Sequence, residues 1–218
     1  MHDLERFRAA VGAWAAGGVD APAAAVVARE LVRDGVGTVV LVEGISDQSA
    51  VEALAARRGR DLAAEGVCVV PIGGATGVGR FLRLFGAHGL AAHVRGLCDE
   101  AEEGYFRRGL EQVGLGTGLS RSAMESLGFY VCVADLEDEL VRALGRAGVE
   151  QVLAAEHDLV RFRVFQNQPA QRGRAVERQV RRFLGTISGR KARYARALVV
   201  AIDSNRIPRP LDHLLGSF

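Results

Sequence analysis

Four short apolar runs, separated by segments of helical character, constrain the fold of this chain more than any other feature. The runs are TVVLV (38–42), VCVVPI (67–72), HVRGLC (93–98) and FYVCVA (129–134). They are nearly continuous rather than alternating, which is typical of strands buried on both faces. Parallel neighbours need crossover connections, and the intervening segments have the length of helices. The pattern predicts an α/β fold with a mostly parallel sheet of about four strands, flanked by helices.

Helical segments precede and follow this alternation. Residues 3–34 are predicted to form two helices, and helices are also predicted after the last strand. We therefore expect an N-terminal helical segment (1–36), an α/β core (37–135) and a helical C-terminal extension (136–218) that completes the site.

Acidic residues stand at the ends of three of the four predicted strands. The first run ends at Glu43, the third at Asp99 and the fourth at Asp135. Ligands of open α/β sheets bind beyond the carboxyl ends of the strands. We therefore expect these three carboxylates to converge on one site.

Three further acids follow closely in the sequence, namely Asp47, Glu102 and Glu137. So much negative charge at one edge is costly unless a cation is bound, and a ligand set made only of oxygens suits Mg²⁺ or Mn²⁺. Each acid also has a purely structural explanation. Asp47 can cap a helix, Glu102 can interact with a helix dipole, and Glu137 can belong to a solvated run. Repetition at successive strands favours the metal site.

The segment PIGGATGVGR (71–80) is a glycine-rich loop after the second run. It lacks the Lys and the Ser or Thr of a Walker A motif, and it lacks the spacing of a dinucleotide fingerprint. Two explanations stay open: backbone amides that approach a phosphate ahead of a helix at Arg80, or a simple tight turn.

The net charge of +2 conceals a strong asymmetry. Residues 1–158 carry 23 acidic and 15 basic side chains, whereas residues 159–218 carry 3 acidic and 13 basic ones. A basic tail on an acidic body suggests a polyanionic partner, because clustered arginines lower the cost of approaching phosphates. A solvated, arginine-rich face is the alternative explanation.

Within this tail, a helix is predicted from a cap at Ser188 to about Asp203, with Arg190, Lys191 and Arg193 in its first turn. Cations there oppose the helix dipole by about 0.3–1 kcal/mol each, and a bound anion would reverse the sign. Lys191 is the only lysine beside 27 arginines. Either a compact, flexible ammonium is needed at this position or the residue is a chance survival.

The remaining composition is that of an ordinary globular protein, with 49% hydrophobic and 25% charged residues. Its three cysteines lie in or at the ends of apolar runs, without metal-ligand spacing, as in proteins of a reducing compartment. The N-terminus has no secretory signal, and no apolar stretch is long enough to cross a bilayer. These features predict a cytoplasmic protein without a membrane partner.

Several of these motifs resemble a known family. A strand ending in Glu-Gly, a following Asp, a glycine loop after the second strand and an acid at the end of the third are features of the TOPRIM domain. The resemblance is closer to the TOPRIM and C-terminal half of the overcoming lysogenisation defect (OLD) family nucleases, over roughly residues 37–215. It is carried by VLVEGISDQSAVEALA, VVPIGGATGVGRFL, GLCDEAEEGYFRRGLE, DLEDELVRALG and GRKARYARALV. No Walker A or signature motif occurs, so a standalone form without the ATPase half is expected.

The resemblance implies a metal-dependent endonuclease or nickase that cleaves DNA with two divalent ions, Mg²⁺ or Mn²⁺. It assigns Glu43, Asp47 and Asp99 to metal binding and Glu137 to a second metal cluster. Glu43 would also be catalytic, together with Lys191, which would stabilise charge on the scissile phosphate.

The remaining site residues are expected from their positions. Asp135 and Glu102 would complete the metal ligands, and Arg190 and Arg193 would hold the DNA backbone without reading bases. ATP dependence would have to come from a separate ATPase partner. The oligomeric state stays open, with a dimer as one option.

The sequence departs from the family at the third strand, where TOPRIM domains usually have Asp-x-Asp. Ala101 occupies the second position, and Glu102 is the expected substitute. If Glu102 does not serve, the chain is a non-catalytic or weakly active metal-dependent nucleic-acid-binding module that acts with an ATPase partner. Nucleotidyl transfer of the primase kind would share the acidic cluster. A topoisomerase is least favoured, because no tyrosine lies in a recognisable strand-passage domain.

Overall fold

The sheet consists of four parallel strands in the order β2-β1-β3-β4. The computed structural model describes residues 2–86, 89–187 and 189–218. The strands are β1 (Thr38–Val42), β2 (Val67–Pro71), β3 (His93–Asp99) and β4 (Phe129–Cys132). The predicted fold class is confirmed, with all four strands at the expected positions.

Both faces of the sheet are covered, because side chains that alternate along β1 enter two different cores. Val39 and Leu41 pack into a cluster with the first two helices and with helices on the same side of the sheet. Val40 and Val42 pack into a cluster on the opposite side. The helices of the first cluster are α1 (His2–Ala16), α2 (Ala21–Arg33), α4 (Val78–Phe85), α5 (Glu103–Gln112) and α6 (Arg121–Ser126).

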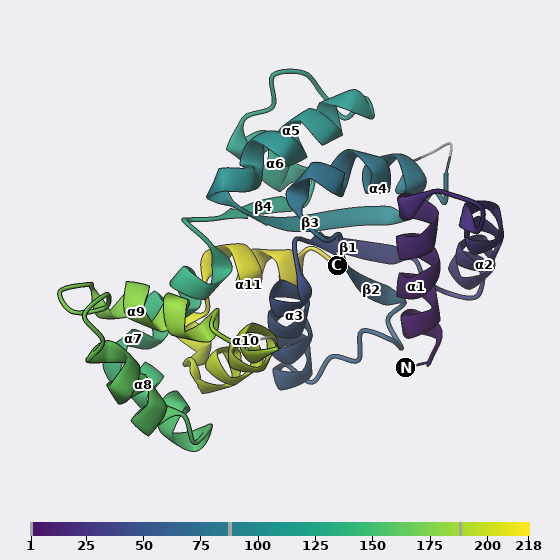
Figure 1. Cartoon of the computed structure of the whole chain (residues 1–218). Coiled ribbons are helices and arrows are strands. Elements are labelled where there is room, and N and C mark those ends of the chain that lie inside the picture. The colour runs from purple at the N-terminus through teal and green to yellow at the C-terminus, as the bar shows by residue number, and fades with distance from the viewer. Residues whose placement is uncertain (1, 87–88, 188) are drawn as a thin grey trace.

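Helix α3 and the helices of the C-terminal part of the chain form the core cluster on the second face, some of them over the sheet and others beyond its edge (Figure 1). These helices are α3 (Ile45–Arg57), α7 (Leu136–Ala155), α8 (Leu159–Gln166), α9 (Val176–Leu184), α10 (Arg190–Ala201) and α11 (Arg209–Gly216). Short 3₁₀ turns complete the chain: η1 (Ala75–Gly77), η2 (Glu100–Glu102) and η3 (Ser204–Arg206). None of the helices in the described ranges is long and apolar enough to cross a membrane.

Helix α10 matters most for the site, since its contact with α3 is the most extensive between any two elements. Its buried side chains Tyr194, Leu198 and Val199 belong to the same core cluster as Val51 and Leu54 of α3. The helix therefore lies beside the one that follows Glu43. The predicted cap, Ser188, lies outside the described residues, and Gly189 is the residue that precedes the first turn.

Helix α7 is kinked at Gly145, whose φ of 73° and ψ of 167° are not helical. The part before the kink begins directly after β4 and carries Glu137. The part after the kink contributes Val149, Val152 and Leu153 to the core cluster that also contains Phe162 of α8 and Phe183 of α9. The kink thus joins the sheet to the helical group of α7, α8 and α9 (Figure 1).

Candidate metal and nucleic-acid site

The carboxyl ends of the strands bring acidic residues to one edge of the sheet. β1 and β3 are parallel neighbours, so Glu43, just past β1, and Asp99, the last residue of β3, lie at the same edge. Asp47 lies in the first turn of α3 and Glu137 in the first turn of α7. Both helices start at this edge, because each follows directly on a strand of the sheet.

These four acids line a single pocket of about 410 Å³ together with the one lysine of the chain. The lining residues are Glu43, Gly44, Ser46, Asp47, Gly73, Gly74, Asp99, Glu137 and Lys191. We call this the acid pocket. It joins segments that are almost 150 residues apart in the sequence, as predicted for Glu43 and Lys191.

Backbone amides hold two of the carboxylates in place. Asp47 Oδ2 accepts a hydrogen bond of 2.9 Å from the Gly44 N–H, which caps the start of α3. Asp99 Oδ1 accepts one of 3.2 Å from the Leu136 N–H at the start of α7. The structural role that the sequence suggested for Asp47 is therefore real, and the same residue also faces the acid pocket.

The acid pocket disfavours the ionised form of its carboxylates. Burial, followed by the charges of Glu137 and Glu43, raises the pKa of Asp47 to about 7, against the lowering effect of the Gly44 amide. Burial and the charges of four neighbouring acids, with Asp47 first, raise the pKa of Asp99 to about 8. The pKa of Glu43 is also raised, first by burial and then by Glu102 and Glu137. A cation would relieve this repulsion.

Two oxygens of the acid pocket are buried without a hydrogen-bond partner in the described part of the chain, Glu43 Oε2 and Glu137 Oε1. Glu137 Oε1 lies 3.3 Å from Lys191 Nζ, an ion pair without the directed geometry of a hydrogen bond. Buried acceptors that remain unsatisfied are costly and call for a ligand or an ion.

The chemistry of these donors fits a hard divalent cation, since the pocket offers carboxylate oxygens, of which Glu43 Oε2 has no hydrogen-bond partner and Glu137 Oε1 has only its ion pair with Lys191. Their positions, in contrast, are not those of a formed metal site. Within residues 2–86, 89–187 and 189–218, no three His, Cys, Asp or Glu side chains are grouped as they would be around a metal ion. The carboxylates thus share a pocket while Asp47 and Glu137 are each held by another group, the Gly44 amide and the Lys191 ammonium.

Two of the predicted metal ligands stand outside the acid pocket. Asp135 caps α7, accepting from the Asp138 N–H at 2.7 Å through Oδ1, and its Oδ2 pairs with Arg181. Glu102 is half-buried at the end of η2. It acts on the pocket through its charge, because it is the strongest of the neighbouring charges that raise the pKa of Glu43.

The glycine-rich loop forms one wall of the acid pocket. Gly73 and Gly74 have φ values of 70° and 108°, which side chains rarely adopt, and the Gly74 N–H donates to the Glu43 carbonyl at 3.2 Å. The loop is therefore more than a turn between elements, because it brings backbone next to the carboxylates.

Arg190 and Arg193, expected to contact nucleic acid, are engaged within the protein. Arg190 is only 6% exposed, stacks on the Phe183 ring at 4.3 Å and lies 3.6 Å from Asp158. Arg193 donates to Asp158 at 2.6 Å and pairs with Glu156. This arrangement supports a structural role for Arg190, whose guanidinium holds the buried Asp158.

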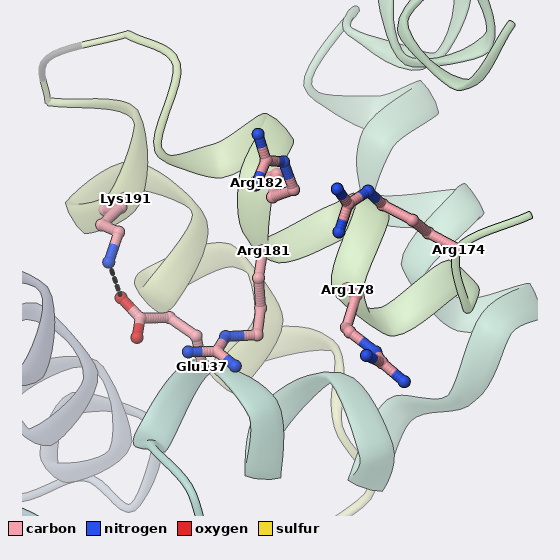
Figure 2. Close-up of a pocket in the computed structure, with 6 residues that line it drawn as sticks. All are labelled: Glu137, Arg174, Arg178, Arg181, Arg182 and Lys191. Atoms are coloured by element: carbon pink, nitrogen blue, oxygen red, sulfur yellow. Dashed lines mark ion pairs between the residues drawn. The ribbon is translucent and has the colours of Figure 1, made fainter. Parts of the chain in front are cut away.

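A second, basic pocket of about 320 Å³ adjoins the acid pocket, and the sequence reasoning did not identify it. Its lining residues are Glu137, Arg174, Arg178, Arg181, Arg182 and Lys191 (Figure 2). Glu137 and Lys191 line both pockets. The signal in the sequence was the spacing of Arg178, Arg181 and Arg182, which places three cations on one face of a helix.

Comparisons with known proteins agree with this geometry. A family model of the overcoming lysogenization defect protein-like TOPRIM domain matches residues 37–99, the segment from β1 to the end of β3. No curated protein matches the chain.

Solved structures with the same fold include two C-terminal regions of OLD proteins. The region from Burkholderia pseudomallei has 21% identity and a TM-score of 0.60, covering 83% of this chain and 95% of that one. The region from Xanthomonas campestris pv. campestris has 22% identity and a TM-score of 0.60, with the same coverage. The chain shares the fold of these regions, and its residues 37–99 match the model of the OLD-like TOPRIM domain.

Proposed function

We propose that the protein is a divalent-metal-dependent phosphodiesterase that cleaves or nicks DNA. The observation that carries this proposal is the acid pocket, where four carboxylates from separate segments face one lysine. Carboxylates hold hard divalent cations, and an ammonium beside them provides a positive charge for a phosphate oxygen. The raised pKa values of Asp47 and Asp99 support the site, because perturbed carboxylates cluster where function requires them.

Glu43, Asp47, Asp99 and Glu137 would hold the ions, Mg²⁺ or Mn²⁺, and two ions are proposed. Asp135 and Glu102 would assist from the border of the acid pocket, Asp135 once released from Arg181. Bound divalent ions supply a water activated for attack and charge stabilisation for the leaving oxygen.

The residues of the chain itself perform the remaining tasks. Glu43 presents an unsatisfied, buried oxygen toward the acid pocket and must be ionised to act. Lys191 Nζ, 3.3 Å from Glu137, would neutralise charge that develops on a phosphate oxygen. Gly73 and Gly74 have no side chains, so they would let the DNA backbone approach the acid pocket without obstruction. Contacts to the DNA backbone position the strand without reading its sequence.

A second candidate function is a metal-dependent nucleic-acid-binding module that acts with a separate ATPase. The specific observation in its favour is Ala101, which stands where a TOPRIM domain usually has its second Asp, while Glu102 does not line the acid pocket. Under either proposal we place the protein in the cytoplasm, because its three cysteines are free thiols. A dimer is one proposal for its assembly.

Nicking of supercoiled plasmid in Mn²⁺ tests the nuclease proposal. We expect Glu43→Gln to abolish nicking and Lys191→Ala to reduce it by about 10²–10³-fold, as for loss of a charge-stabilising group. The matched controls are Glu30→Gln and Arg196→Ala, both exposed positions away from the two pockets. Unreduced nicking by both site variants would refute the assignment. DNA binding without any cleavage by the wild type would favour the binding module.

A further inference from the structure

The basic pocket has an excess of positive charge that the fold itself does not balance. Four arginines and Lys191 line it, against the single carboxylate of Glu137. Arg181 pairs with Asp135, and Lys191 pairs with Glu137. Within the described ranges, Arg174, Arg178 and Arg182 form no ion pair with a carboxylate, so three guanidinium groups repel one another around one cavity.

Helix α9 fixes the positions from which these arginines extend. Val180, Phe183 and Leu184 are buried in the core, so the opposite face of the helix is exposed. The buried Gln179 anchors the helix further, since its amide donates to the Gln171 carbonyl at 2.9 Å and accepts from Gln166 at 2.7 Å. In Figure 2 the arginines extend from α9 and the preceding loop, and the paired Lys191 and Glu137, which also line the acid pocket, lie at one side.

We propose that the basic pocket binds a second phosphate of the nucleic-acid strand, adjacent to the phosphate at the acid pocket. This inference rests on the proposed function and extends it, because it names Arg178 and Arg182 as residues that hold the strand. The two pockets share Glu137 and Lys191, so a strand that leaves one enters the other. Arginine matches phosphate with paired N–H donors, and every side chain that lines the basic pocket carries a charge, five of the six positive.

Binding of a fluorescent oligonucleotide in EDTA tests this proposal without any contribution from metal or cleavage. We expect Arg178→Gln/Arg182→Gln to raise Kd about tenfold and to lower the slope of log Kd against log[NaCl] by about one, for the one phosphate that is no longer neutralised. The matched control is Arg33→Gln/Arg196→Gln, which removes the same charge from exposed positions outside the basic pocket. We expect the control to change Kd less than twofold.

Oligonucleotides with a 5′-phosphate and with a 5′-hydroxyl distinguish the source of the phosphate. Equal losses of affinity for both would assign the basic pocket to an internal phosphodiester, and a loss confined to the phosphorylated strand would assign it to a terminal phosphate. Either result supports the phosphate site. Equal affinities of the pocket variant and the control variant would overturn it.

The nicking assay separates this proposal from the nuclease proposal. If the wild type does not nick plasmid but the pocket variant still loses oligonucleotide binding, the nuclease proposal fails and the phosphate site stands. If the wild type nicks and the pocket variant binds like its control, the phosphate site fails and the nuclease proposal stands.

Discussion

Asp158 is the centre of a buried polar network that links the start of α8 to α10. Its side chain is 1% exposed and accepts hydrogen bonds from Arg161, Arg193 and the Tyr194 hydroxyl, while Arg190 lies 3.6 Å away. Removing one partner of such a buried network leaves uncompensated charge. We expect Asp158→Asn to lower the free energy of unfolding by about 3–5 kcal/mol, measured by urea denaturation. The exposed Asp203→Asn should change it by less than about 0.5 kcal/mol, and equal effects of the two variants would contradict this role.

The pH dependence of stability follows from the same residue. Burial raises the pKa of Asp158, but hydrogen bonds from Arg161 and Tyr194 and the charges of Arg190 and Arg193 outweigh it, so its pKa lies below the ordinary value. A lowered pKa stabilises the fold above the pKa of the unfolded chain, and this contribution is lost as the pH falls through the folded value. Stability should therefore decline below about pH 4 in the wild type and less steeply in Asp158→Asn.

Residue-level prediction from the sequence succeeded where backbone geometry determines the neighbours. Glu43 and Asp99 had to meet, because the ends of parallel strands lie at one edge. Arg190 and Lys191 show the opposite case. They are adjacent in the sequence, yet one is buried against Asp158 and the other faces the acid pocket. Which side of the helix faces the core depends on tertiary packing, which the charge pattern alone does not reveal.

The kink of helix α7 at Gly145 was not predicted from the sequence. At Gly145 the backbone has a φ of 73°, and a Cβ there would meet no atom within 4 Å. The cost of a side chain is therefore conformational alone, about 1–3 kcal/mol for this region of positive φ and extended ψ. Helix α7 packs against α8 and against α9, which carries Arg178, Arg181 and Arg182 of the basic pocket.

A pair of Gly to Ala substitutions tests this explanation. We expect Gly145→Ala to lower the free energy of unfolding by about 1–3 kcal/mol in urea denaturation. Gly12, inside α1, also has open space around its Cα but an ordinary helical backbone, so Gly12→Ala should raise it by about 0.5–1 kcal/mol. Opposite signs support the kink as a glycine-dependent bend, and a stabilising Gly145→Ala would exclude it.

Elements with strong local signals were predicted closely, and those without them were not. The four runs of β-branched and apolar residues became β1 to β4, with differences of one or two residues at their ends. The predicted helix in the basic tail became α10. Helices α8 and α9 were not separated in advance, although Pro169 and Gly173 lie between them and are the local signal for the break. The proposed division at residues 36 and 135 stays a prediction.

At the scale of the whole molecule, the split of charge along the sequence becomes a contact in space. The acidic body supplies Glu43, Asp47 and Asp99, and the basic tail supplies Lys191 and the arginines of α9. Because α10 packs on α3, this part of the basic tail lies against the acidic part of the chain. The composition predicted a polyanionic partner, but only the fold shows that the two charge signs border each other at one edge of the sheet.

This arrangement makes the stability of the protein depend jointly on pH and divalent ions. The pKa of Asp47 is raised to about 7 and that of Asp99 to about 8, mainly by burial. Raised carboxylate pKa values mean that the folded state binds more protons than the unfolded chain between about pH 4 and pH 8, so stability falls as the pH rises through this range. A cation competes with those protons for the same oxygens and restores stability where the carboxylates are ionised.

Thermal unfolding with and without Mn²⁺ at pH 5.5 and pH 8.5 tests this coupling. We expect Mn²⁺ to raise the Tm at pH 8.5 by several degrees and to have little effect at pH 5.5, where Asp47 and Asp99 are protonated. In Glu43→Gln/Asp47→Asn the shift at pH 8.5 should disappear, whereas the exposed pair Glu30→Gln/Asp203→Asn should retain it. An equal shift at both pH values, or one that survives in the acid-pocket variant, would place the bound ion elsewhere on the protein.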